Sequence, residues 1–326
     1  MLPRGAEVEQ PRCADAVAVD AQETAFVEEW ARSTPYNPYR NYRLISKVQA
    51  SQVLAATVLE ATPLVMRLWQ RAANSSPTGL VRIADLPWDS ELYGLKMGRI
   101  THICGDLAGP ALRALIDATA FDHLAARVDA SDVATQRALS EAGFFPVDSV
   151  QRFVHYPARG APPEPAARPS RARSTFRKYE PRDRDDVLSL TAETYTRYPG
   201  RYHADPRLRD RSVERYVRWA EKYVDGEADT IWVAESSGRV MGYLAFRYNR
   251  TLLRILGLGC YGSGLGASRG GDYQSLCRHA LMVTRDIDWQ IAEFDTQIDN
   301  YHVHRIYRDL KFDYVYAEHT YHLHRG

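Results

Sequence analysis

An internal repeat is the sequence feature that most constrains the fold. The segments RVDASDVATQRALSEAGFFP (residues 127–146) and DTQIDNYHVHRIYRDLKFDY (residues 295–314) align without a gap, each position 168 residues from its counterpart. Both predict a strand end, a polar loop, a short helix and a Phe that enters the next strand. Leu139 of the first copy matches Tyr307 of the second. A repeat of this length predicts two related domains, unless two ordinary strand–helix–strand segments merely look alike.

Length, charge and composition limit the classes of protein that this chain can represent. Its 326 residues, 45% of them hydrophobic, suffice for two domains with cores of their own. The formal net charge of +1 gives no electrostatic reason to expect a nucleic-acid partner. No apolar run approaches the roughly 20 residues of a membrane span, and MLPRGAEVEQPRCADAV lacks the order of a signal peptide. We therefore expect a cytoplasmic protein without a membrane partner, and leave open whether it forms a homodimer.

Changes in composition divide the chain into four parts. Residues 1–79 read as a polar arm followed by helices at residues 22–34 and 46–72, with Pro63 marking a break. Short strands alternating with helices occupy residues 80–156. Residues 157–174, rich in Pro, Ala and Arg and without periodicity, predict a linker. Residues 175–326 begin a second strand–helix pattern, in which two strands flank the turn Ser237–Gly238.

Several motifs taken together resemble one known family. Residues 175–326 give the order strand, helix, paired strands, Gly-rich loop with helix, and strand. The Gly-rich loop is ASRGGDYQSL (267–276), and an N-x6-Y-x4-F pattern follows at residues 300–312. This set resembles the GNAT superfamily of acyl-CoA N-acyltransferases. LPWDSELYGLKMGRI (86–100), the Gly-Phe pair at 143–144 and RYHADPRL (201–208) add a resemblance to the two-domain dTDP-fucosamine acetyltransferase type.

The resemblance implies both a fold and a co-substrate. The implied fold is α/β (α+β), with tandem GNAT-like domains that are each a mixed, mostly antiparallel sheet flanked by helices. The first domain is expected to be incomplete, after an N-terminal helical extension. The implied co-substrate is acetyl-CoA, without a metal, and the four cysteines form no CxxC pair that would suggest one. Compared with the family pattern, the Gly-rich loop is one residue short, and Lys311 replaces a Gly.

The Gly-rich segment suits the binding of a pyrophosphate. Glycines let several backbone N–H groups turn toward one anion, and the following helix adds the positive end of its dipole. Arg269 can pair with a phosphate, whereas Asp272 can cap the helix instead. The alternative is a plain turn between a strand and a helix. The predicted cofactor-binding residues of this segment are Ser268, Arg269, Gly270, Gly271, Asp272 and Tyr273.

Tyr307 is the candidate general acid. Acyl transfer from a thioester to an amine needs a proton for the leaving thiolate, and a neutral phenol can donate one. The alternative is a core Tyr whose hydroxyl is bound elsewhere. Asn300 can bind the cofactor's amide arm or can simply cap the helix. Leu139 cannot donate a proton, so the first copy is expected to be structural or to form a wall of the substrate site.

The acceptor and the general base are less constrained. The segment YTRYPGRYHADPRL (195–208) predicts a loop in which Tyr198, Arg201, Tyr202 and His203 can stack on or pair with an anionic acceptor, or only anchor the loop. The candidates for the general base are His203, Glu193, Asp205 and Glu235.

These inferences lead to an acetyl-CoA-dependent N-acetyltransferase. Its acceptor is expected to be a small primary amine such as a nucleotide-linked amino sugar. One alternative is another small amine of a biosynthetic pathway, either an amino acid or a hydrazine-like intermediate. A further alternative is a protein that binds acyl-CoA without catalysis.

Overall fold

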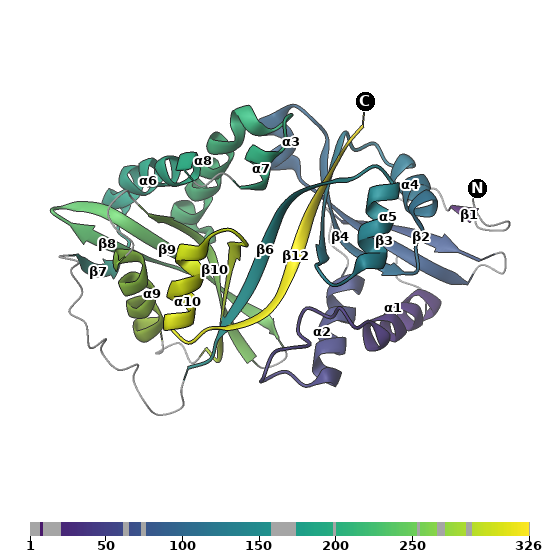
Figure 1. Ribbon diagram of the computed structural model, residues 1–326, viewed down its shortest axis with the longest axis horizontal. Helices are drawn as coiled ribbons and strands as arrows, with labels where there is room; N and C mark the ends of the chain where they lie inside the picture. The colour runs from purple at the N-terminus through teal and green to yellow at the C-terminus, as the bar shows by residue number, and fades with distance from the viewer. Residues whose placement is uncertain are drawn as a thin grey trace. The chain divides into compact units, whose positions relative to one another are not determined.

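The computed structural model describes residues 7–8, 21–60, 65–72, 76–157, 174–197, 200–252, 255–265, 271–284 and 289–325 (Figure 1). Nearly all of the predicted linker, residues 157–174, therefore lies outside the described residues. Among the described helices, none is long and apolar enough to cross a membrane.

The chain forms two compact units whose boundary differs from the expected one. The first unit contains Met1–Ser149 and Tyr316–Gly326, and the second contains Val150–Val315. The end of the chain, which was expected in the second domain, thus belongs to the first. Residues 150–155, which were expected in the first domain, belong to the second.

The first unit is a sheet with helices on both faces. Its strands lie in the order β1-β2-β3-β4-β5-β12, and every pair is antiparallel except β4 with β5. The elements are β1 (Glu7–Val8), α1 (Ala21–Ser33), α2 (Lys47–Leu59), β2 (Val65–Arg71), β3 (Pro77–Asp85), α3 (Pro87–Tyr93), β4 (Met97–Gly105), α4 (Gly109–Asp117), β5 (His123–Asp129), α5 (Val133–Glu141), the start of β6 (Phe145–His155) and the end of β12 (Asp313–His324).

Alternating side chains explain the layers of this unit. On β3, Val81 and Ile83 belong to the core that α4 and α5 cover, whereas Leu80 belongs to a second core beneath α1 and α2. Successive side chains of a strand point to opposite faces, so one strand supplies both cores. The N-terminal helices expected before residue 80 are present, and they cover one face of the first unit.

The second unit repeats this arrangement. Its strands lie in the order β6-β11-β10-β9-β8-β7, antiparallel except for β10 with β11. The elements are β7 (Thr175–Lys178), η1 (Pro181–Asp183), α6 (Arg184–Arg197), α7 (Arg201–Ala204), η2 (Arg209–Arg211), α8 (Ser212–Lys222), η3 (Tyr223–Glu227), β8 (Thr230–Ser236), β9 (Arg239–Leu252), β10 (Ile255–Leu265), α9 (Gly271–Val283), β11 (Ile291–Gln297) and α10 (Tyr301–Asp309).

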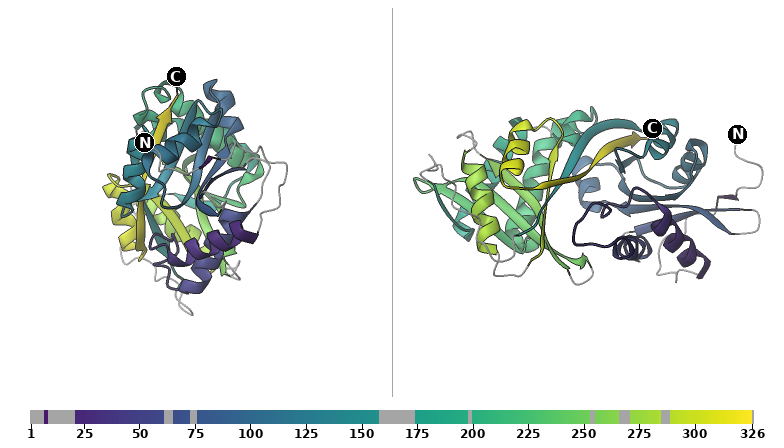
Figure 2. Two further views of the ribbon diagram at one scale, coloured as in Figure 1. Left: turned by 90° about the vertical axis from the view of Figure 1, so that its right-hand side faces the viewer. Right: turned by 60° about the horizontal axis from the view of Figure 1, so that its bottom comes forward.

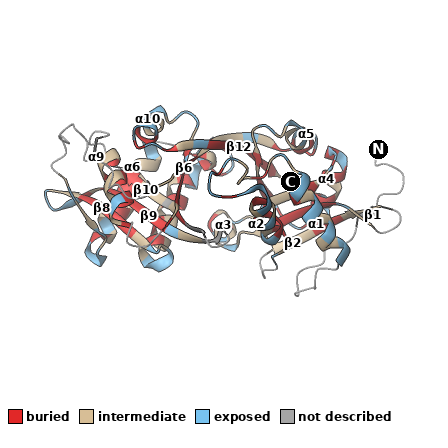
Figure 3. Ribbon diagram, turned by 90° about the horizontal axis from the view of Figure 1, so that it is seen from below, coloured by how far each residue is buried: buried red, intermediate tan, exposed pale blue. Residues whose placement is uncertain are grey.

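Two cores again follow from alternation along the strands. Leu244 and Phe246 of β9 pack with α9 and α10, whereas Tyr243 and Ala245 pack with α6 and α8. The teal helices α6 and α8 and the yellow-green helices α9 and α10 accordingly lie on opposite faces of the green strands (Figures 1 and 2). The buried residues gather on the strands and on the helix surfaces that face them (Figure 3).

The predicted repeat is confirmed element by element. Shifting β5, α5 and the start of β6 by 168 residues gives β11, α10 and the start of β12. The helices even begin and end alike. Asp132 and Asn300 are both N-caps whose side chains accept a hydrogen bond from the backbone three residues on. Gly143 and Lys311 both follow the helix with positive φ, 96° and 62°.

The two copies exchange their last strands. β6 pairs with β11 of the second unit, and β12 pairs with β5 of the first, both antiparallel. The register is the same in both cases, because Glu318 lies opposite Asp129 and Val150 lies opposite Gln297. Each unit is therefore completed by a strand that the other copy supplies, which explains why no cut in the sequence separates the units.

One expected helix is wrong in part. Residues 46–72 were expected to be helical, but the helix α2 ends at Leu59, and β2 runs from Val65 to Arg71. In β2, Leu68 packs in the core with α4, whereas Trp69 packs in the core with α1 and α2. The apolar residues of this segment also recur every three to four positions, as in a helix. Periodicity alone therefore did not distinguish a strand from a helix in so short a segment.

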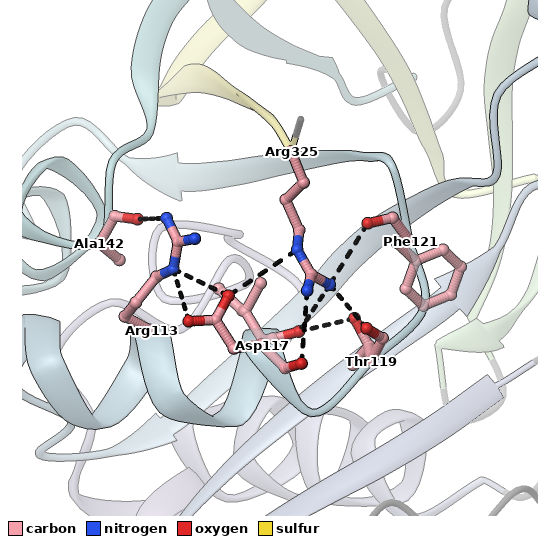
Figure 4. Close-up of polar contacts among 7 residues, drawn as sticks. Arg113, Asp117, Thr119, Phe121, Ala142 and Arg325 are labelled. Carbon is pink, nitrogen blue, oxygen red and sulfur yellow. Dashed lines mark hydrogen bonds and ion pairs between the residues drawn. The ribbon is translucent and has the colours of Figure 1, made fainter.

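Arg325, which follows β12, binds the first unit through several hydrogen bonds. The Arg325 guanidinium donates to the carbonyls of Thr119 at 2.6 Å and of Ile116 at 3.3 Å, at the end of α4 (Figure 4). It also donates to the carbonyls of Asp117 and Phe121, both at 3.4 Å. A cation here satisfies carbonyls that the end of a helix leaves without partners.

Candidate active site

The two parallel strands of the second unit separate after a short pairing. β10 and β11 pair only from Gly257 to Gly259 and from Ile291 to Glu293. Beyond that point β10 stays paired with β9, and β11 stays paired with β6. A β-bulge between Cys260 and Gly262 lies just where the strands part. The backbone edges of two strands therefore face a gap in the middle of the sheet, and bulges often accompany functional sites.

Glycines in β10 let aromatic rings approach this gap closely. A Cβ at Gly262 would meet the ring of Tyr223 at 2.2 Å, and one at Gly264 would meet the ring of Tyr243 at 2.4 Å. Both rings belong to the core beneath α6 and α8. The Gly-rich run of β10 is thus explained by close packing against rings that support the bulged strand from one face.

Tyr307 lies on the other face of the sheet, in α10. The helix begins after Asn300, and its Ile306 and Tyr307 are buried. The Tyr307 ring packs against the rings of Phe153, Phe294 and Phe312. Its hydroxyl lies 3.5 Å from the hydroxyl of Tyr273, in the first turns of α9.

Tyr307 and Tyr273 belong to the core against which Cys260, at the bulge, packs. Burial raises the pKa of Tyr307 well above its usual value, and the Cys260 thiol adds to this shift, as does Asp295 more weakly. Burial likewise raises the pKa of Tyr273 well above the usual value. Both phenols therefore stay protonated at neutral pH. The structure brings Tyr307 and Tyr273 together, beside the strand that carries the bulge.

The structure describes only some of the predicted cofactor-binding residues. Ser268, Arg269 and Gly270 lie outside the described residues. Gly271 and Asp272 form the first turn of α9, and Tyr273 is buried against Tyr307. Asn300 acts as the N-cap of α10, and its amide also donates to the Thr296 hydroxyl at 3.1 Å.

The predicted acceptor segment is partly helical rather than a loop. It contains the last turn of α6 and the short helix α7, and Tyr198 lies outside the described residues. Tyr202 is buried, whereas His203 is exposed. The Arg201 guanidinium donates to the Tyr202 hydroxyl at 3.1 Å and lies 4.9 Å from the Tyr202 ring centre.

Sequence reasoning missed Arg215 in this region. Its guanidinium lies 4.4 Å from the Tyr202 ring centre and 4.8 Å from the Trp219 ring centre. The amphipathic pattern of α8 gave no signal for it, because the helix contains a second arginine, Arg218, from which the sequence does not distinguish it.

The candidate bases are engaged in other contacts. Glu193 pairs with Arg197 at 2.6 Å, and Glu235 accepts from Arg177 at 2.7 Å on the far strands of the sheet. Asp205 is fully buried and accepts from the backbone of Arg207 at 2.9 Å.

A carboxylate that the sequence did not single out lies at the gap. Asp295 lies two residues after Glu293, the last β11 residue that pairs with β10, and its side chain is 36% exposed. It forms an ion pair with Arg152 of the exchanged strand β6. Arg152 lies beside Asp295 only because β6 pairs with β11. The sequence of residues 175–326 alone therefore could not predict this ion pair.

Comparison with solved structures identifies the fold. A GCN5-related N-acetyltransferase from Sphaerobacter thermophilus superposes with a TM-score of 0.59 at 15% identity, over 99% of this chain and 97% of that one. A tandem GNAT protein from the clavulanic acid biosynthesis pathway gives 0.56 at 15% identity, over 98% and 99% of the two chains. The glucosamine N-acetyltransferase region of a fungal multi-domain GH3 β-N-acetylglucosaminidase gives 0.62 at 12% identity, over 98% of this chain and 38% of that one.

These likenesses establish a fold of two GNAT-type units in tandem. No protein-family model matches the sequence, and no curated protein matches it. The expected fold class, a mostly antiparallel mixed sheet flanked by helices in each of two GNAT-like domains, is confirmed.

Proposed function

We propose that this chain is an acetyl-CoA-dependent N-acetyltransferase of the GNAT type whose catalytic unit is the second one. The observation that carries the proposal is the gap between β10 and β11, with a bulge at Cys260–Gly262 and with Tyr307 and Tyr273, whose hydroxyls lie 3.5 Å apart, in the core against which Cys260 packs. The first unit has Leu139 in place of Tyr307 and takes a supporting role.

The residues at the gap have separate tasks. The N-terminal end of α9 offers backbone N–H groups and a positive dipole end to the pyrophosphate of the co-substrate. Backbone N–H groups along the bulged strand can stabilise the oxyanion of the tetrahedral intermediate. Asp295 is a candidate to accept the proton that the amine loses, directly or through water.

Proton transfer to the thiolate completes the reaction. The amine nitrogen forms a bond to the acyl carbon, the C–S bond breaks, and the thiolate takes the proton of the Tyr307 hydroxyl. Burial raises the pKa of Tyr307, but a thiolate in the same desolvated place is also a stronger base than in water. The transfer therefore stays feasible, and Tyr307 regains its proton from solvent.

The acceptor is proposed to be a small primary amine. The resemblance to dTDP-fucosamine acetyltransferase favours a nucleotide-linked amino sugar, whose anionic part Arg201 and the neighbouring Tyr202 could hold. The likeness to a glucosamine N-acetyltransferase region fits an amino sugar as well. The likeness to a tandem GNAT protein from the clavulanic acid biosynthesis pathway fits the second candidate, another small amine of a biosynthetic pathway such as an amino acid or a hydrazine-like intermediate.

A thiol-release assay tests the proposal. Purified protein with acetyl-CoA is offered nucleotide-linked amino sugars, free amino sugars, amino acids and hydrazines, and free CoA is measured together with the mass of the product. Release that depends on one class of amine is the expected result. Binding of acetyl-CoA by calorimetry without release would favour the non-catalytic alternative, and absence of binding would overturn the proposal.

A further inference from the structure

The end of β11, which borders the gap, lies close to aromatic residues of α6 and α8. The Tyr195 and Tyr216 rings stack with their centres 3.7 Å apart and their planes at 6°. A Cβ at Gly200, just before α7, would meet the Tyr216 hydroxyl at 2.3 Å and the Gln297 amide nitrogen at 3.6 Å. Gln297 is the last residue of β11. The start of α7 therefore lies beside the strand that borders the gap.

The face of the sheet that α6 and α8 cover is also the face of the candidate proton acceptor. Phe294 of β11 packs on the opposite face, with α9 and α10. Because successive side chains of a strand alternate, Asp295 and Gln297 point toward α6 and α8, roughly 7 Å apart along the strand. Tyr223 lies against Gly262 of the bulge from this same face. An amine at Asp295 is therefore within the length of a small molecule of the start of α7.

Arg201, the first residue of α7, is a half-buried cation. Its guanidinium donates to the Tyr202 hydroxyl at 3.1 Å, which uses one of its five N–H donors. The groups whose electrostatic effect reaches this guanidinium are Arg215, Tyr202 and Tyr216. None of them is a carboxylate, and within the described part of the chain Arg201 forms no ion pair. An anionic group of a ligand can therefore balance its charge and accept from its other donors.

A second cation lies close to Arg201. The buried Arg215 side chain places its guanidinium 4.4 Å from the centre of the Tyr202 ring, and the Arg201 guanidinium lies 4.9 Å from the same centre. The positive charge of Arg215 opposes that of Arg201. Positive charge beside a partly buried guanidinium raises the cost of leaving that guanidinium without an anion. A carboxylate or a phosphate relieves this cost, since a guanidinium binds either group with two parallel hydrogen bonds.

We propose that the acceptor amine carries an anionic group, a carboxylate or a phosphate, and that Arg201 binds this group and thereby selects the acceptor. The amine reaches the thioester at the gap while the anion stays at the start of α7. This inference rests on the proposed function and narrows its substrate class. Nucleotide-linked amino sugars and amino acids fit, whereas neutral amino sugars and hydrazines without an anionic group do not.

Calorimetry without acetyl-CoA tests the anion site independently of catalysis. The amino-sugar probes are glucosamine, which has no anionic group, glucosamine 6-phosphate, and muramic acid, which has a carboxylate. A linear pair consists of 4-aminobutan-1-ol and 4-aminobutanoate. At least one anionic probe is expected to bind wild-type protein at least tenfold more tightly than its neutral counterpart. The comparison of glucosamine 6-phosphate with muramic acid distinguishes a phosphate from a carboxylate.

Variants of Arg201 connect this preference to one side chain. Arg201→Gln removes the cation and is expected to weaken binding of the anionic probe at least tenfold without changing binding of the neutral one. Arg201→Lys keeps the charge without the planar fork and should retain part of the affinity. Arg218→Gln is the matched control in α8, where Arg218 pairs with Glu214 at 3.1 Å, and it should leave binding unchanged. In the thiol-release assay, Arg201→Gln should raise KM for the acceptor and not KM for acetyl-CoA.

Failure of the proposed function and failure of this inference give different results. Binding that prefers the anionic probe and loses the preference in Arg201→Gln, without thiol release, would contradict acetyl transfer but support the anion site. Thiol release as fast with neutral as with anionic amines would support acetyl transfer but overturn the role of Arg201. That role is also overturned if no anionic probe binds more tightly than its neutral counterpart, or if Arg201→Gln, folded by circular dichroism, keeps the preference.

Discussion

At the scale of single residues, each position of one copy of the repeat has a counterpart in the other copy, which can serve as a control in mutagenesis. Tyr307 and Leu139 occupy the same place in the two copies, and both are buried. Tyr307→Phe removes one hydroxyl and keeps the ring among Phe153, Phe294 and Phe312. If this hydroxyl protonates the thiolate, kcat should fall about 10²–10⁴-fold with little change in KM for acetyl-CoA. Steady-state kinetics measure both, with Leu139→Phe as the control that should leave chemistry unchanged.

Lys311 carries backbone strain that its counterpart Gly143 avoids. A non-Gly residue with φ of 62° pays a steric cost of roughly 1–2 kcal/mol, part of which the greater freedom of Gly in the unfolded chain offsets. Lys311→Gly should raise the free energy of unfolding by about 0.5–1 kcal/mol. Urea denaturation measures it. Gly143→Ala is the reverse experiment and should lower stability, since its φ is 96°.

His102 links stability to acid pH. Its pKa is lowered from 6.5 to about 3 in the folded protein, mainly by burial. At a pH between these two values, His102 is protonated in the unfolded chain but not in the folded protein. The free energy of unfolding therefore decreases as pH falls. The free energy of unfolding falls by up to about 1.4 kcal/mol per pH unit in this range. Melting temperatures of wild type and His102→Leu measured from pH 7 to pH 4 should diverge, with the wild type losing more.

At the scale of elements, the packing of β10 is open to a direct test. A methyl group at Gly262 meets the ring of Tyr223, whereas one at Gly259 finds its nearest neighbour at 3.6 Å. Gly262→Ala should therefore cost about 1–3 kcal/mol from overpacking, and acetyl-CoA turnover should fall because the bulge shifts. Gly259→Ala, on the same strand, should be tolerated. Comparable stability of the two variants in urea would contradict this account of the glycines.

Elements were predictable where local signals agree. The cap at Asn300 and the turn at Ser237–Gly238 are both short-range features, and each appears where the sequence indicates it. The strand β2 was missed because its seven residues satisfy two periodicities. Which strands pair is not a local property. The contact of Arg152 with Asp295 was therefore beyond sequence reasoning.

At the scale of the whole molecule, Arg325 tests the anchoring of the exchanged strand. Arg325→Ala leaves the carbonyls at the end of α4 without their donor and should cost about 1.5–3 kcal/mol, as for hydrogen bonds to a charged group. Arg113→Ala removes an exposed ion pair with Asp117, both side chains more than 40% exposed, and one hydrogen bond to the Ala142 carbonyl at 3.3 Å, and should cost less, about 1 kcal/mol. Thermal melts of the two variants make the comparison, and equal losses would contradict the role assigned to Arg325.

The exchange also changes which fragments can be expected to fold. A chain starting near residue 174 lacks Val150–His155, the partner of β11, and leaves one edge of its sheet open. A test of acetyl-CoA binding by the second unit alone must therefore keep that strand.

Synthesis on the ribosome gives the exchanged strand another consequence. Chains emerge from the N-terminus, and domains commonly fold as they appear. Here the first unit contains Tyr316–Gly326, so its sheet stays open at β5 until residues 318–324, the partners of β5, have been synthesised. During that time the exposed edge of β5 can pair with other nascent chains. A product that stops before Tyr316 therefore leaves the sheet of the first unit unfinished, although the residues of that unit up to Ser149 were made first.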